Sequence, residues 1–191
     1  PKQNSIFIKS MLVDNVVLVQ YLAICPFIGM TSETGKATGM GLATTFVIVL
    51  ATAVTWPIYK LIMVPLGLEF LQTLIFILVI ASLVQLVEFY LKKSAPGLYS
   101  AMGIYLSLIT TNCAVLGVTI NCISKNYNYG ESIIYALGSA MGFLFSMIIM
   151  SGVRTRLKTA KVPKAFSGTP ILYVAAGLLS LAFLGFKGLI K

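Results

Sequence analysis

Two cysteines, each inside a short polar or irregular interruption of an apolar run, are the residues best suited to chemistry. Cys113 follows Thr110, Thr111 and Asn112, and a glycine stands four residues after it. Cys25 is followed directly by a proline and, four residues later, also by a glycine. Proline lacks a backbone N–H and disfavours helix at the residue before it. Both cysteines are therefore expected on broken helices, which at membrane depth must face protein or line a cavity.

Two thiols at equivalent points of a chain suggest a metal site. Thiolates select zinc, copper or iron–sulfur clusters, and a [2Fe–2S] cluster takes four cysteines. Only Cys25 and Cys113 are good ligand candidates, so two further ligands would have to come from another chain. A single cysteine is more often a small apolar packing residue, and Cys122 keeps that interpretation because it has no counterpart in the first half. The absence of histidine from the sequence excludes histidine as a ligand or a base.

The composition predicts an all-α membrane protein, with residues 1–191 as a single integral membrane domain. Hydrophobic residues make up 58% of the chain and charged residues only 10%, whereas soluble domains carry about 25% charged residues. A transmembrane helix needs roughly 20 apolar residues. Six segments qualify, and they are Ser5–Cys25, Ala37–Tyr59, Phe70–Leu91, Gly97–Ile120, Glu131–Val153 and Pro170–Phe186.

The six segments group as three plus three, in half-repeats of about residues 1–95 and 96–191. The first segment of each half carries a cysteine, and the second helices carry Gly35-x-x-x-Gly39 and Gly138-x-x-x-Gly142, a spacing that lets membrane helices pack closely. An odd number of spans per half gives the halves opposite orientations. This predicts an inverted repeat, an architecture of transporters with a site near the bilayer midplane.

The basic residues predict the orientation of the chain. Six lie at the termini and in the even-numbered connections, and eight lie in the odd-numbered ones. The decisive group is the five basic residues from Arg154 to Lys164, a stretch with no acidic residue. The positive-inside rule places this loop in the cytoplasm and both termini outside. The six outer residues are Lys2, Lys9, Lys60, Lys125, Lys187 and Lys191.

Two acidic residues are weaker candidates for a functional role. Asp14 lies inside the first segment, towards its outer end, and an ionisable residue in a membrane is a candidate for ion passage. Glu88 lies near the end of the third segment, four residues before Lys92. A helical pair at this spacing is expected to form a surface ion pair.

Four stretches together resemble the A-type membrane subunit of the Rnf complex, a bacterial ion-translocating electron-transport complex. The resemblance covers essentially the whole chain. The closely related E-type subunit of the sodium-translocating NADH:quinone oxidoreductase typically has Thr after its first cysteine and Val-Asn before its second. Pro26 and Thr111-Asn112 therefore favour the Rnf family, whereas Asp14 replaces an expected Asn and inherits no family role. The stretches are Cys25–Gly29, Gly39–Val47, Leu108–Gly117 and Ala176–Phe186.

The resemblance implies that this chain and a homologous E-type subunit of the Rnf complex sit in opposite orientations and each give two cysteines to one [2Fe–2S] cluster. By motif, the ligands here would be Cys25 and Cys113. The family passes electrons between ferredoxin and NAD, together with other Rnf subunits, and couples this to Na⁺ or H⁺ movement in the bacterial inner membrane. The alternatives are a non-redox inverted-repeat carrier, a structural scaffold and the equivalent subunit of the quinone reductase.

Overall fold

The structure is a computed structural model that describes residues 1–189, without the side chains of residues 98, 101, 102 and 104. All regular elements in this part of the chain are helices, and five helical stretches, some of them made of consecutive elements, are long and apolar enough to cross a membrane. The expectation of an all-α membrane protein is therefore supported. The five candidates cover Thr34–Leu66, Glu69–Ser94, Tyr105–Ser124, Tyr129–Thr159 and Thr169–Leu189.

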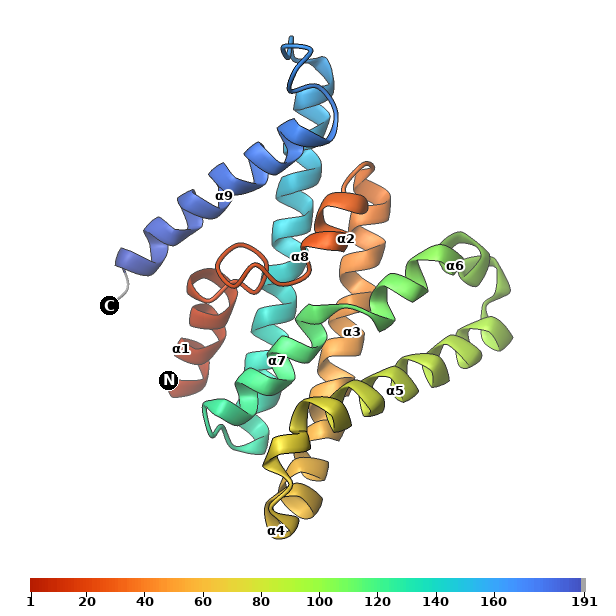
Figure 1. The fold of residues 1–191 in the computed structure, drawn as a ribbon, viewed down its shortest axis with the longest axis vertical. Helices are drawn as coiled ribbons and strands as arrows, with labels where there is room; N and C mark the ends of the chain where they lie inside the picture. Colours follow the sequence, from red (N-terminus) through yellow and green to blue (C-terminus); the bar gives the residue numbers. More distant parts are fainter. Residues whose placement is uncertain (190–191) are drawn as a thin grey trace.

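Two long helices, α3 (Thr34–Ile58) and α8 (Tyr129–Thr159), form the centre of the molecule. They pack along each other, and the other elements surround them (Figure 1). Gly41 allows the close approach, because a Cβ there would overlap the side chain of Leu144. Small residues at such a contact are typical of membrane helix packing.

The N-terminal segment is not the single continuous span that the sequence predicts. Helix α1 (Lys2–Ile8) continues as the π-helix η1 (Lys9–Val13), and regular structure resumes only at the short α2 (Ile24–Gly29). Asn15 accounts for the interruption. Its Oδ1 accepts the N–H groups of Val17 and Leu18 at 3.1 and 3.2 Å. Asparagine offers the backbone such local bonds in place of helix.

The segment is nevertheless firmly docked on α8. A Cβ on Gly142 would lie 2.8 Å from the Met11 carbonyl oxygen, and one on Gly138 would overlap Ser10. The Asn15 amide also donates to Ser146 Oγ at 2.9 Å. The second small-residue motif thus packs closely as expected. In contrast, a Cβ on Gly35 or Gly39 would meet nothing within 4 Å.

The remaining spans follow in two groups. After α3, the chain passes through η2 (Tyr59–Met63), α4 (Val64–Leu66) and η3 (Glu69–Leu71) into α5 (Gln72–Ser94). Helix α6 (Pro96–Thr110) then leads to α7 (Cys113–Ser124), and Figure 1 shows the two meeting at an angle beside α3. Helix α9 (Thr169–Leu189) runs obliquely back past the N-terminal segment.

Each end of the molecule has its own set of polar contacts. At the start of α8, Lys2 pairs with Glu131 at 3.2 Å and the Trp56 indole N–H donates to the Tyr127 carbonyl oxygen at 3.1 Å. At the other end of α8, the Arg154 guanidinium donates to the Ile28 carbonyl oxygen at 2.6 Å. The 31 residues of α8 span about 46 Å at 1.5 Å per residue. The N-terminus and the basic loop after α8 therefore lie at opposite ends of the molecule.

Candidate functional site: the paired cysteines

The structure brings the Cys25 and Cys113 segments into direct contact. The Ala23 backbone N–H donates to Cys113 Sγ at 2.8 Å. Ala23 and Tyr21 both have left-handed backbones, with φ of 61° and 57°. Such conformations cost a non-glycine residue of order 1–3 kcal/mol and persist where the surrounding structure enforces them. The strained turn places a backbone donor on the sulfur of the second cysteine.

Helix α7 is packed along the turn that precedes Cys25. Gly117 faces Leu22 so closely that a Cβ on the glycine would overlap the leucine side chain. One turn further on, the Asn121 amide donates to Gln20 Oε1 at 2.9 Å. These two contacts fix the position of Cys113, at the start of the same helix, relative to Cys25.

The polar residues before Cys113 stabilise the start of α7. Asn112 is the N-cap, and its Oδ1 accepts the Ala114 N–H at 3.0 Å. The hydroxyls of Thr110 and Thr111 donate back to carbonyl oxygens of α6 at 3.0 and 3.1 Å. An N-cap satisfies one of the free N–H groups at a helix start. These three side chains thus bond to the backbone where the helix is interrupted, whereas the Asn112 Nδ2 is buried without a hydrogen-bond partner among the described residues.

The expectation that both cysteines face inward is not met, because the Cys25 and Cys113 thiols are exposed on the surface of the chain, whereas the third thiol is buried. Cys122 is 1% exposed, and its Sγ lies 3.7 Å from the Ser132 carbonyl oxygen. Between residues 1 and 189, no three His, Cys, Asp or Glu side chains gather as a metal site. The exposed pair offers two soft donors, and a metal held there would take its other ligands from elsewhere. Two of the four thiolates of a [2Fe–2S] cluster fit this donor set.

The acidic candidates lie away from the cysteines. Asp14 pairs with Lys125 at 3.3 Å at the C-terminal end of α7. Glu88 accepts a hydrogen bond from the Tyr99 hydroxyl at 3.3 Å. The expected ion pair of Glu88 with Lys92 is absent from the described ion pairs, because Lys92 Nζ lies over the Tyr99 ring, 5.7 Å from its centroid.

Comparison with known proteins identifies the family of the chain. The sequence profile of a family described as "Rnf-Nqr subunit, membrane protein" matches residues 3–190. The A-type subunit of the Na⁺-translocating ferredoxin:NAD⁺ oxidoreductase complex from Acetobacterium woodii is 50% identical over 184 residues, which are 96% of each chain. The A-type subunit of an ion-translocating oxidoreductase complex from Azoarcus is 53% identical over 178 residues, covering 93% of this chain and 92% of the relative.

These matches span nearly the full length of the chain and include both cysteine segments. They agree with the apolar helices and with the resemblance found in the sequence. The chain belongs to the Rnf-Nqr family of membrane subunits, whose members are parts of ion-translocating oxidoreductase complexes.

Proposed function

We propose that this chain holds two ligands, Cys25 and Cys113, of a [2Fe–2S] cluster in the membrane part of an Rnf complex. A homologous membrane subunit of the Rnf E type supplies the other two. The cluster, when bound, accepts and releases one electron between the redox centres of the other Rnf subunits. The complex exchanges electrons between ferredoxin and NAD and couples this to Na⁺ or H⁺ transport. The carrying observation is the contact of the two exposed thiol segments through the Ala23 N–H and Cys113 Sγ.

The residues around the thiols are suited to this role. Hydrogen bonds to the sulfurs are among the features that set the potential of an iron–sulfur cluster. The Ala23 N–H supplies one such bond to Cys113 at 2.8 Å. The thiols lie beside the α6–α7 junction, in the interior of the candidate span Tyr105–Ser124. A redox centre at that depth shortens the distance an electron must cross in a hydrocarbon core about 30 Å thick.

We further propose the inverted repeat and the orientation that the sequence suggests. In this arrangement α3 and α8 are equivalent second helices, and each cysteine segment is the interrupted first helix of its half. Lys2 and the basic loop after α8 lie at opposite ends of the molecule. The basic stretch from Arg154 to Lys164 is not all loop as the sequence suggests, since α8 continues to Thr159. The separation supports a cytoplasmic location for this stretch and an N-terminus outside. The C-terminus follows one further span, α9, and is placed outside as well.

An alternative is the equivalent subunit of a Na⁺-translocating NADH:quinone oxidoreductase. The family profile covers both kinds of subunit. The names of the similar proteins from Acetobacterium woodii and Azoarcus favour the ferredoxin-linked complex. A non-redox carrier would have the interrupted helices but would not need two thiols in contact segments.

The test is an electron paramagnetic resonance spectrum of the purified, reduced complex, with its iron content. The proposal expects a [2Fe–2S] signal that is assigned to the membrane subunits and disappears when this subunit is deleted. A complex whose iron–sulfur signals are all unchanged without this subunit would favour the carrier.

A further inference from the structure

A lysine-lined hollow opens at the end of the molecule that carries the N-terminus. It has a volume of about 760 Å³ and lies between η1, the α7–α8 connection and the end of α9. Asp14 is the single carboxylate among its described lining residues. Its four lysines are Lys2, Lys9, Lys125 and Lys187.

The positive charge of this hollow is unusual for the side of the membrane on which the proposed orientation places it. Its four lysines are among the six basic residues that the proposed topology puts outside, where basic residues are usually sparse. Burial acts to lower the pKa of Lys125, but the nearby Tyr135 and Asp14 offset this and hold that pKa above the usual lysine value. Lys125 therefore stays charged. Asp14 and Glu131 neutralise two of the four charges through their ion pairs, which leaves a net positive site.

A buried polar group without a partner lies at the same hollow. Tyr135 lines it and is 1% exposed, and its hydroxyl has no hydrogen-bond partner among the described residues. A buried polar group left unpaired is costly. The lysines can only donate hydrogen bonds and the tyrosine hydroxyl can donate one as well as accept one, so an anionic acceptor such as a phosphate would suit this site.

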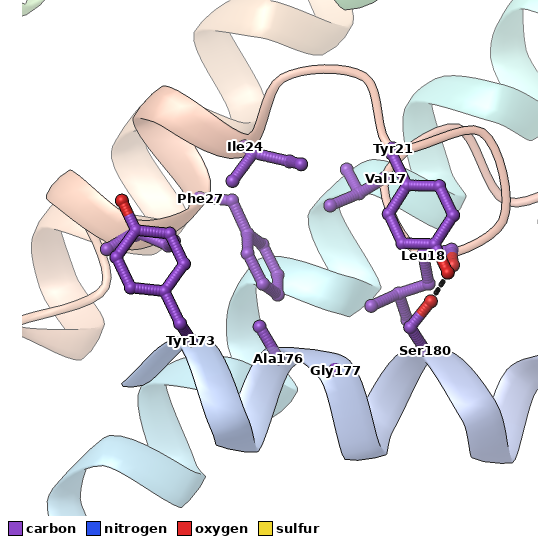
Figure 2. A pocket seen from close by; sticks show the side chains of 10 residues that line it. Val17, Leu18, Tyr21, Ile24, Phe27, Tyr173, Ala176, Gly177 and Ser180 are labelled. Atoms are coloured by element: carbon purple, nitrogen blue, oxygen red, sulfur yellow. Dashed lines mark hydrogen bonds between the residues drawn. The ribbon is translucent and has the colours of Figure 1, made fainter. Parts of the chain in front are cut away.

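An apolar crevice lies further along the same face of α9. It has a volume of about 200 Å³ and separates α9 from the segment that leads to Cys25 (Figure 2). The α9 residues on its wall are Tyr173, Ala176, Gly177 and Ser180, and Ser180 donates to the Leu18 carbonyl oxygen. Residues three and four apart share a helix face, so Lys187 continues this row. From Ser180 to Lys187 the helix rises about 10 Å.

From the lysine hollow and the crevice we infer that this seam binds one anionic phospholipid of the outer leaflet. The phosphate lies in the hollow with Lys9 and Lys187, and one acyl chain lies in the crevice beside Tyr173 and Gly177. The spacing suits a lipid, because one leaflet contributes about 15 Å of hydrocarbon. Basic pockets between membrane helices bind anionic headgroups on the cytoplasmic side, and the same charge attraction acts in a basic pocket on the outer side. An acidic segment of a partner protein would suit the lysines but not the apolar crevice. The inference rests on the proposed orientation only for the choice of leaflet.

The test measures lipid that remains with the whole complex after purification in mild detergent. Phosphatidylglycerol and cardiolipin are extracted and counted per complex by mass spectrometry. The Lys9→Gln/Lys187→Gln variant is expected to lose about one anionic lipid relative to the unmodified complex. The matched control, Lys161→Gln/Lys164→Gln, removes the same charge from the loop after α8 and is expected to retain it. Gly177→Leu fills the crevice without changing charge and is expected to lose the same lipid.

Three other outcomes would overturn part or all of this inference. Unchanged lipid in the Lys9→Gln/Lys187→Gln variant overturns the headgroup site, and unchanged lipid in Gly177→Leu overturns the placement of the acyl chain. Loss of a partner protein with unchanged lipid also overturns the inference, because the lysines would then bind protein. The iron–sulfur signal of the same preparations reports on the proposed function separately.

Discussion

The hydrogen bond from the Ala23 N–H to Cys113 Sγ makes the two thiols parts of one unit. The donor precedes Cys25 by only two residues, so a movement of either cysteine segment alters the surroundings of the other. The left-handed backbones of Tyr21 and Ala23 hold that donor in place. Serine in place of either cysteine would keep the size but remove the soft donor.

Substitution of the cysteines one at a time separates ligands from packing. Cys25→Ser and Cys113→Ser are each expected to abolish the membrane [2Fe–2S] signal and ferredoxin-dependent NAD reduction, because the cluster loses one of four thiolates. Cys122→Ser is expected to retain both, since this buried thiol faces the Ser132 carbonyl oxygen. Iron content and electron paramagnetic resonance of the three variants decide the matter. Equal loss in all three would contradict the assignment of Cys25 and Cys113 alone.

Gly117 is expected to control the fit between α7 and the Cys25 turn. Gly117→Val would push against Leu22, and overpacking of this kind typically costs about 1–3 kcal/mol. We expect a lower thermal midpoint and a shifted [2Fe–2S] potential, because the Ala23 N–H moves relative to Cys113. Gly39→Val is the control, since a Cβ at Gly39 meets nothing within 4 Å. A shift in the potential of the control but not of Gly117→Val would refute this role of Gly117.

For these residues, the sequence suggested that the two cysteine segments lie together but did not show the hydrogen bond that joins them. The repeated Cys-to-Gly spacing suggested that Cys25 and Cys113 belong together, and in the structure the Ala23 N–H, two residues before Cys25, contacts Cys113 Sγ. The hydrogen bond from Ala23 depends on a positive φ at an alanine. The sequence could not predict this conformation, because a left-handed backbone is usually found at glycine or asparagine. Likewise, the contact of Asp14 with Lys125 joins residues 111 positions apart and follows from the fold alone.

Among the elements, the N-terminal segment differs most from expectation. Five predicted spans correspond to the candidate spans, with ends that move by one to eight residues. The remaining predicted span, Ser5–Cys25, is helical only as far as Val13, because the Asn15 side chain accepts a hydrogen bond from the backbone that follows it. The sequence showed the polar interruption at Asp14 and Asn15. It could not show that Asn15 also bonds to Ser146 across the molecule and so stabilises a non-helical turn.

The docking of α1 and η1 on α8 is expected to depend on Gly138. Gly138→Leu would overlap Ser10 and approach the Phe7 carbonyl oxygen, which forces the N-terminal segment away from α8. We expect faster proteolysis before α2 and a loss of stability of at least about 1–3 kcal/mol. Gly152→Leu on the same helix is the control, because its Cβ meets nothing within 4 Å. Equal protease resistance in the two variants would show that the segment is held by other contacts.

For the whole molecule, the distribution of basic residues predicts which end faces the cytoplasm. In intact cells, a membrane-impermeant maleimide is expected to label Lys2→Cys but not Lys164→Cys. Permeabilised cells should show both. The physical reason is the group of five basic residues from Arg154 to Lys164, which the positive-inside rule retains in the cytoplasm. Labelling of Lys164→Cys in intact cells would reverse the proposed orientation.

The cluster is expected to form only when this chain is assembled with its partner subunit. The exposed pair of thiols supplies only two ligands, so the isolated chain should bind no stoichiometric [2Fe–2S] cluster. Co-expression with its homologous membrane partner should restore it. Iron and sulfide analysis of the two preparations is the measurement, and a full cluster in the isolated chain would contradict the shared site.

The strained turn at Tyr21 and Ala23 also limits how this protein can evolve. The first half of the chain carries the donor, and the second half carries the sulfur that accepts it. Leu22 and Gly117 fit each other across the same boundary. The halves are therefore fitted to each other across this contact. A chimera that joins the first half of one relative to the second half of another would inherit a donor and an acceptor fitted to different partners.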